Sequence, residues 1–127
     1  MPHRPERLAE MIRDELTELL EGELADPRIG LVEVARVEVD SPTRLVHVAF
    51  TIAGEPQEQG RTMAGLMAAR GFLRAEIGRR LQLHRMPELR FELDRSQEST
   101  ARIDDLLTRA HKRQAARLRR QQKSEED

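Results

Sequence analysis

Arg70 and Arg74, near the middle of the chain, stand where an anion could be bound. They flank Gly71 in the segment Ala69-Arg70-Gly71, which interrupts a helical pattern of apolar residues. In one straight helix Arg70 would point into the apolar stripe, and burying an unpaired arginine costs several kcal/mol. We therefore predict a bend here, absorbed by Gly71, because glycine weakens a helix by ~1 kcal/mol relative to alanine. The bend would turn both guanidinium groups outward beside a helix start, which suits phosphate and hence nucleic acid.

Other basic residues extend this cluster along the same segment. They are Arg79, Arg80, His84 and Arg85, with Glu76 as the acid among them. Charge runs are usually solvated helix faces, and that is the alternative interpretation. The position of Arg70 at the predicted bend favours a functional role instead. We predict that Arg70 and Arg74 contact phosphate, that Gly71 supplies the bend, and that the patch continues through Arg79, Arg80 and Arg85.

Residues for catalysis or metal binding do not form any recognisable pattern. The four histidines are far apart in the sequence, and no phosphate-binding loop, dinucleotide-binding loop or nucleophile elbow is present. The serines fall in predicted turns, caps or the C-terminal tail. We therefore predict that the protein is not an enzyme and uses no metal and no cofactor.

The aromatic residues are few, and we expect all of them in the core. They are Phe50, Phe72 and Phe91, and the chain has no tryptophan or tyrosine. Proteins that hold single-stranded bases usually stack them on exposed aromatic rings. If the partner is RNA, we expect it to be recognised through phosphate and shape.

The elements that position the arginines follow from apolar periodicity. Three-to-four spacing predicts helices, and alternation predicts strands. The predicted order is helix, strand, strand, broken helix, strand and helix, over about residues 5–22, 31–39, 46–52, 57–83, 89–93 and 96–110, with turns at 26–30 and 40–43. A change of alternation at Ala35-Arg36 predicts a β-bulge. The first two strands should pair antiparallel, and a crossover through the broken helix should make the third parallel to the second.

Charge is divided unevenly along the chain. Residues 1–60 hold 6 arginines against 13 Asp and Glu, a net charge of −7, whereas residues 61–127 hold 16 Lys and Arg against 10 Asp and Glu, a net charge of +6. The total of −1 does not exclude nucleic-acid binding, because the local field steers a polyanion. We predict one domain over residues 1–107, followed by a flexible basic tail over residues 108–127. That tail could equally serve only solubility.

Composition fits a soluble cytoplasmic protein. The chain has 127 residues and no cysteine, so it can hold no disulfide framework, which agrees with a reducing compartment. Its N-terminus has no apolar signal core, and no apolar run approaches the ~20 residues of a membrane helix. We expect no contact with a membrane.

The predicted order, α-β-β-α-(kink)-α-β with an additional C-terminal helix, resembles the type II KH fold. The G-x-x-G loop of KH domains is absent, and Ala69-Arg70-Gly71 stands in its place. Together with the segments Asp26-Pro27-Arg28-Ile29-Gly30, Pro87-Glu88-Leu89-Arg90-Phe91 and Asp94-x-Ser96-x-Glu98, this resembles the ribosome-binding factor A family over about residues 4–107.

The resemblance implies a monomeric cytoplasmic factor that binds free small (30S) ribosomal subunits and their 16S rRNA. It also implies support of late rRNA maturation and processing, a role in growth in the cold, and work alongside assembly GTPases. The acidic first half is unusual for an RNA binder, and we expect the first helix to face away from RNA. One alternative is a protein-interaction adaptor without direct RNA contact, and another is a nuclease, for which no catalytic residues are found.

Overall fold

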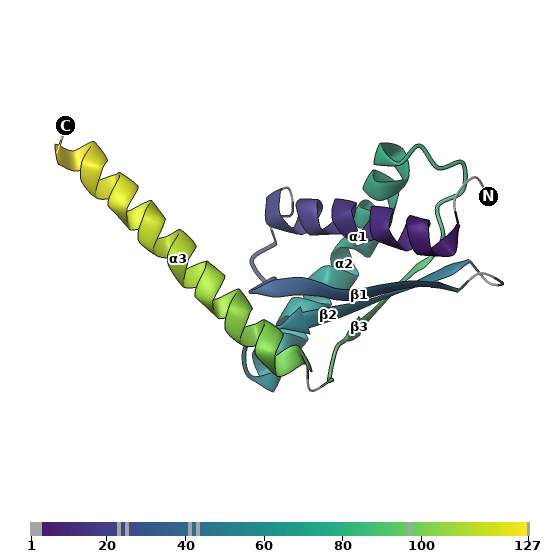
Figure 1. The fold of residues 1–127 in the computed structure, drawn as a ribbon, viewed down its shortest axis with the longest axis horizontal. Coiled ribbons are helices and arrows are strands. Elements are labelled where there is room, and N and C mark those ends of the chain that lie inside the picture. The colour runs from purple at the N-terminus through teal and green to yellow at the C-terminus, as the bar shows by residue number, and fades with distance from the viewer. Residues whose placement is uncertain are drawn as a thin grey trace.

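Figure 1 shows a computed structural model of the chain, which describes residues 4–22, 24, 26–40, 42, 44–96 and 98–126. The elements follow in the order α1 (Pro5–Gly22), β1 (Val32–Asp40), β2 (Leu45–Ile52), α2 (Pro56–Arg80), β3 (Leu89–Leu93) and α3 (Glu98–Glu126). This is the predicted α+β, KH-like order. His3, two positions of the predicted turn at 40–43 (Ser41 and Thr43) and Asp127 lie outside the described residues.

The three strands form one sheet in the order β1-β2-β3. β1 pairs antiparallel with β2, and β2 pairs parallel with β3, as predicted. The register shifts between Val34 and Arg36, which confirms the bulge. Because of this extra residue, the valines before and after the bulge all pack against the core: Val32, Val34, Val37 and Val39.

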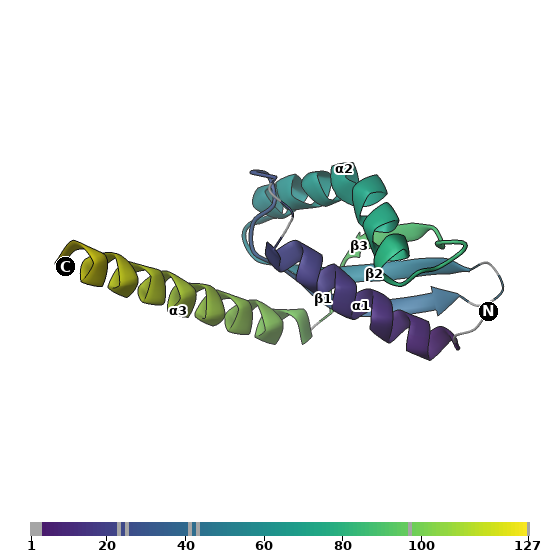
Figure 2. The same cartoon turned by 90° about the horizontal axis from the view of Figure 1, so that it is seen from above.

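The core lies between the sheet and the two helices α1 and α2, which cover one of its faces (Figures 1 and 2). α1 contributes a fully buried stripe at three-to-four spacing, namely Leu8, Ile12, Leu16 and Leu19. Phe50 is a core residue as predicted, and Phe91 is partly buried against the core, where the two rings meet edge to face with centroids 5.0 Å apart. The same prediction for Phe72 is wrong, because its side chain is 49% exposed on α2.

α2 is one uninterrupted helix of 25 residues, where the sequence predicted two helical pieces. Its axis nevertheless bends near the middle, as Figure 2 shows. The core-facing positions Leu66, Ala69, Leu73 and Ile77 keep regular three-to-four spacing through this region. Ala69 therefore occupies the stripe position that the sequence analysis gave to Arg70, and a continuous helix need not bury the arginine. The assignment of the bend to Ala69, Arg70 and Gly71 remains a prediction.

α3 leaves the domain and extends far from the other elements (Figure 1). Its first turns are anchored to the sheet, since Ser99 and Leu106 are buried and the Arg102 guanidinium donates to the Ala35 carbonyl at 2.7 Å. The helix continues to Glu126, where the sequence analysis predicted a flexible tail beyond residue 107. Residues 98–126 contain no glycine or proline and are rich in Arg and Ala, which favour helix. The domain boundary at 107 remains a prediction.

Candidate nucleic-acid interface

Arg74 is committed to an internal contact. Its Nε donates to the Pro87 carbonyl at 3.0 Å, and a terminal nitrogen donates to the Met86 carbonyl. From the other side, Arg44 donates to the Arg85 carbonyl at 3.5 Å. The loop before β3 is thus held by two half-buried arginines. Arg74 therefore positions this loop. A residue that only bound phosphate would not need these two internal hydrogen bonds.

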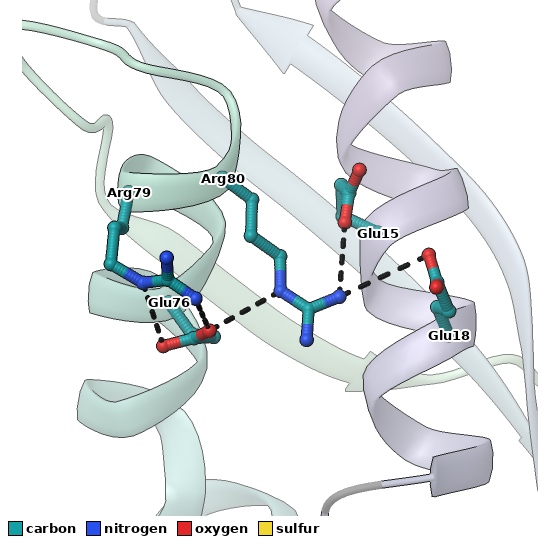
Figure 3. Close-up of polar contacts among 5 residues, drawn as sticks. All are labelled: Glu15, Glu18, Glu76, Arg79 and Arg80. Atoms are coloured by element: carbon teal, nitrogen blue, oxygen red, sulfur yellow. Dashed lines mark hydrogen bonds and ion pairs between the residues drawn. The ribbon is translucent and has the colours of Figure 1, made fainter.

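Arg79 and Arg80 both pair with Glu76 on their own helix (Figure 3). The hydrogen bond from Arg79 is the main cause that holds the pKa of the Glu76 carboxyl below its ordinary value. Arg80 also reaches α1, where it lies 3.3 Å from Glu15 and 3.9 Å from Glu18. With only 19% of its side chain exposed, Arg80 ties α1 to α2. At the C-terminal end of α2, much of the positive charge of the predicted phosphate-binding patch is therefore neutralised by these carboxylates.

Arg70 and Arg85 differ from the other members of the predicted patch. Neither side chain makes an ion pair or a hydrogen bond with any residue that the structure describes. Arg85 is exposed, and Arg70 is half-buried at the edge of the apolar stripe. A guanidinium without a carboxylate partner keeps its full charge available to an external anion. Of the predicted arginines, these two are the best placed for phosphate.

The solvent-facing side of α2 beside Arg70 is almost uncharged. We call it the α2 outer face, and its exposed members are Ala64, Met67, Ala68, Gly71, Phe72 and Ala75. Met67 and Phe72 are 43% and 49% exposed, which is high for large apolar side chains. An added Cβ at Gly71 would meet nothing within 4 Å, so packing within the chain does not require glycine there. Small residues around two large ones make a face that a partner's backbone could approach closely.

A family model of ribosome-binding factor A matches residues 4–107. This chain belongs to the ribosome-binding factor A family. The ribosome-binding factor A of Koribacter versatilis (strain Ellin345) is 46% identical over 113 residues, which make up 89% of this chain and 92% of that protein.

Solved structures agree with this assignment to the ribosome-binding factor A family. A Thermotoga maritima protein solved by NMR is 32% identical, with a TM-score of 0.64 over 76% of this chain and 93% of that one. A homology model of the Thermus thermophilus ribosome-binding factor A, fitted into a cryo-EM map of a 30S complex, is 26% identical, with a TM-score of 0.58 over 71% of this chain and 94% of that one.

One segment that carried the resemblance to ribosome-binding factor A has a clear structural role. The turn at residues 26–30 docks on α2, where the buried Thr62 hydroxyl accepts from the Gly30 amide at 3.1 Å and donates to the Arg28 carbonyl at 3.4 Å. A Cβ at Gly65 would lie 2.7 Å from Ile29, so only glycine lets the turn approach the helix so closely. This contact fixes the N-terminal half of α2 against the turn.

Asp26 closes the same turn and should make it sensitive to acid. Its carboxylate accepts from the Arg28 side chain at 2.7 and 3.1 Å and from the Arg28 amide at 2.9 Å, and these bonds lower the pKa of Asp26 from 3.8 to about 2. Because the folded pKa is depressed, the stabilisation is full above the unfolded pKa of 3.8 and is lost as pH falls through about 2. NMR titration of the Asp26 carboxyl should give a midpoint near 2, and a midpoint near 3.8 would show that the turn is open.

The members of the interface that sequence reasoning missed are Met67 and Phe72. Phe72 was expected in the core because it is aromatic, and Met67 was not singled out as a binding residue. The stripe formed by Leu66, Ala69, Leu73 and Ile77 already fills the core side of a helix, and Phe72 stands one position before Leu73 and so points to another side. The spacing of the apolar stripe could therefore have indicated from the sequence that Phe72 is exposed.

Among the described residues, no group of three or more His, Cys, Asp or Glu side chains could hold a metal ion. Within the same ranges, no helix has the length and apolarity needed to cross a bilayer.

Proposed function

We propose that this protein binds the small ribosomal subunit and contacts its 16S rRNA through the α2 outer face together with Arg70 and Arg85. Membership in the ribosome-binding factor A family and the 30S complex of the Thermus thermophilus protein support the choice of partner. The observation that carries the proposal is the exposed, nearly uncharged α2 outer face with unpaired Arg70 at its edge. An RNA backbone could lie against the small residues while Arg70 meets a phosphate.

The protein would act without catalysing a reaction. It would be a cytoplasmic monomer that stabilises one arrangement of the maturing rRNA and leaves when the mature arrangement removes its site. In this way it would support late maturation and processing of 16S rRNA, alongside assembly GTPases, and its contribution would matter most for growth in the cold. The acidic exposed side of α1 would face away from the RNA, because like charges repel.

Sedimentation of the protein with ribosomal fractions tests this proposal. In a sucrose gradient the protein should co-sediment with free small subunits and should be absent from translating ribosomes. The association should weaken steeply as salt rises, because phosphate contacts release counterions. Protein that sediments equally with all ribosomal fractions would contradict the proposal.

A second candidate, docking on a ribosomal protein, is favoured by the exposure of Met67 and Phe72. Apolar contacts of this kind persist at high salt, whereas phosphate contacts do not. Association that survives both nuclease digestion and high salt would therefore favour the protein partner over rRNA.

A further inference from the structure

The part of α3 that extends beyond the domain carries all its basic side chains on one side. Residues 109–123 contain no acid, and their basic residues are Arg109, Lys112, Arg113, Arg117, Arg119, Arg120 and Lys123. At 3.6 residues per turn these positions fall within a sector of about 160°, less than half of the helix circumference. The remaining sector holds no Lys or Arg, and its members are Ala110, His111, Gln114, Ala115, Leu118, Gln121 and Gln122. Solubility alone would not require such one-sided placement.

These basic side chains are accessible and largely unpaired. All seven are exposed, and the helix that carries them stands clear of the domain (Figure 1). Arg109 pairs with Glu33 of β1 at 2.6 Å, whereas the others make no ion pair with any residue in the described ranges. Like charges three or four positions apart on a helix repel each other by ~0.2–0.5 kcal/mol per pair. A polyanion lying along this face would relieve that repulsion.

We call the part of α3 that extends beyond the domain, residues 109–126, the arm. The surroundings of its base limit where a polyanion can lie. A cavity of about 890 Å³ separates α3 from α1 and β1, and Lys112 and Arg113 line its α3 wall. The opposite wall carries Asp14, Glu21 and Glu33 together with Arg13, and Glu33 is paired with Arg109. Acids outnumber bases on this wall, so it attracts phosphate less than the outer part of α3, where residues 109–123 contain no acid. A polyanion should therefore follow the arm outward from Arg113.

We propose that the basic face of α3, from Arg113 to Lys123, lies along the phosphate backbone of double-stranded RNA. At 1.5 Å per residue the stretch from Arg113 to Lys123 is about 15 Å long, enough to meet more than one phosphate along a strand. The arm has no aromatic residue on which single-stranded bases could stack. It also lacks an apolar centre of the kind that protein interfaces bury, since Leu118 lies on the opposite side.

The test neutralises the basic face while keeping the helix. The variant Arg113→Gln/Arg117→Gln/Arg120→Gln retains helix formers at all three positions, and circular dichroism checks that helicity is unchanged. The matched control adds Gln114→Arg/Leu118→Arg/Gln121→Arg, which restores the total charge on the opposite side. Binding of each full-length variant to a fully paired RNA hairpin is measured by fluorescence anisotropy over a range of salt concentrations.

We expect the neutralised variant to bind the hairpin at least tenfold more weakly. The slope of log K against the logarithm of the salt concentration should be shallower by about 2, because each lost phosphate contact reduces the slope by ~0.7–0.9. The control should not regain the affinity. Wild-type affinity in the neutralised variant, or recovery in the control, would overturn the proposal.

This inference rests on RNA being the partner of the proposed function, but the two can fail separately. If the α3 variant binds small subunits normally while Arg70→Glu does not, the α3 proposal is wrong and the proposed function stands. If the α3 variant keeps its affinity for the hairpin but loses the subunits, the arm contacts a ribosomal protein instead, which also overturns the RNA assignment.

Discussion

Reversing one charge at the edge of the α2 outer face, with Arg70→Glu, should weaken binding to small ribosomal subunits by ten- to hundredfold, or about 1.4–2.7 kcal/mol. Arg70 makes no ion pair or hydrogen bond within the described part of the chain, so its charge is free to meet a phosphate. The substitution replaces an attraction by a repulsion at that point. The free energy of unfolding should change by no more than about 0.5 kcal/mol, because no internal partner is lost.

Arg79→Glu is the matched control for this prediction, because it reverses the same charge on the same helix. Arg79 is bonded to Glu76, and its side chain is 70% exposed toward the end of α2. Its reversal should leave subunit affinity within about twofold of wild type if the contact surface is centred on Arg70. Co-sedimentation at several protein concentrations gives both affinities. Equal losses in the two variants would mean that the whole α2 charge matters and not the site at Arg70.

The fold was predictable because its signals are local. Alternation in β1 slips by one residue at Ala35-Arg36, and a slip of this kind can keep one face buried only through a bulge, which the register confirms. The crossover from β2 to β3 through a helix fixed the parallel pairing. These inferences need only neighbours along the chain and general rules of chirality.

The site was predictable only in part. Its details depend on which side of α2 faces the core and on residues distant in the sequence that pair with the arginines. Choosing Arg70 as the stripe position overlooked Ala69, which stands one residue earlier and fills the same core contact. The partner of Arg80 on α1, Glu15, is 65 positions away in the sequence, so no local pattern reveals that this arginine is occupied. The sequence analysis treated every arginine of the cluster as able to bind phosphate. Tertiary contacts decide which of these side chains have no partner within the protein.

Arg74 provides the sharpest contrast between the two sources of information. The sequence predicts a phosphate contact, whereas the structure gives this residue the carbonyls of Met86 and Pro87. Arg74→Met removes both hydrogen bonds and keeps much of the apolar stem. We expect it to lower the free energy of unfolding by about 2–3 kcal/mol, because hydrogen bonds to charged groups contribute more than neutral ones and the half-buried carbonyls would lose their donor.

Arg85→Met is the control for this second prediction, because Arg85 is exposed on the same loop without a side-chain partner among the described residues. Its effect on stability, measured by urea unfolding, should stay within about 0.5 kcal/mol, while its subunit affinity should fall. If instead Arg74→Met unfolds at the wild-type urea concentration and loses as much subunit affinity as an Arg70 variant, Arg74 contacts phosphate as the sequence predicts. The loop before β3 would then be held by its other contacts, chiefly the Arg44 bond to the Arg85 carbonyl and the bond from the Val46 amide to the Glu88 carbonyl.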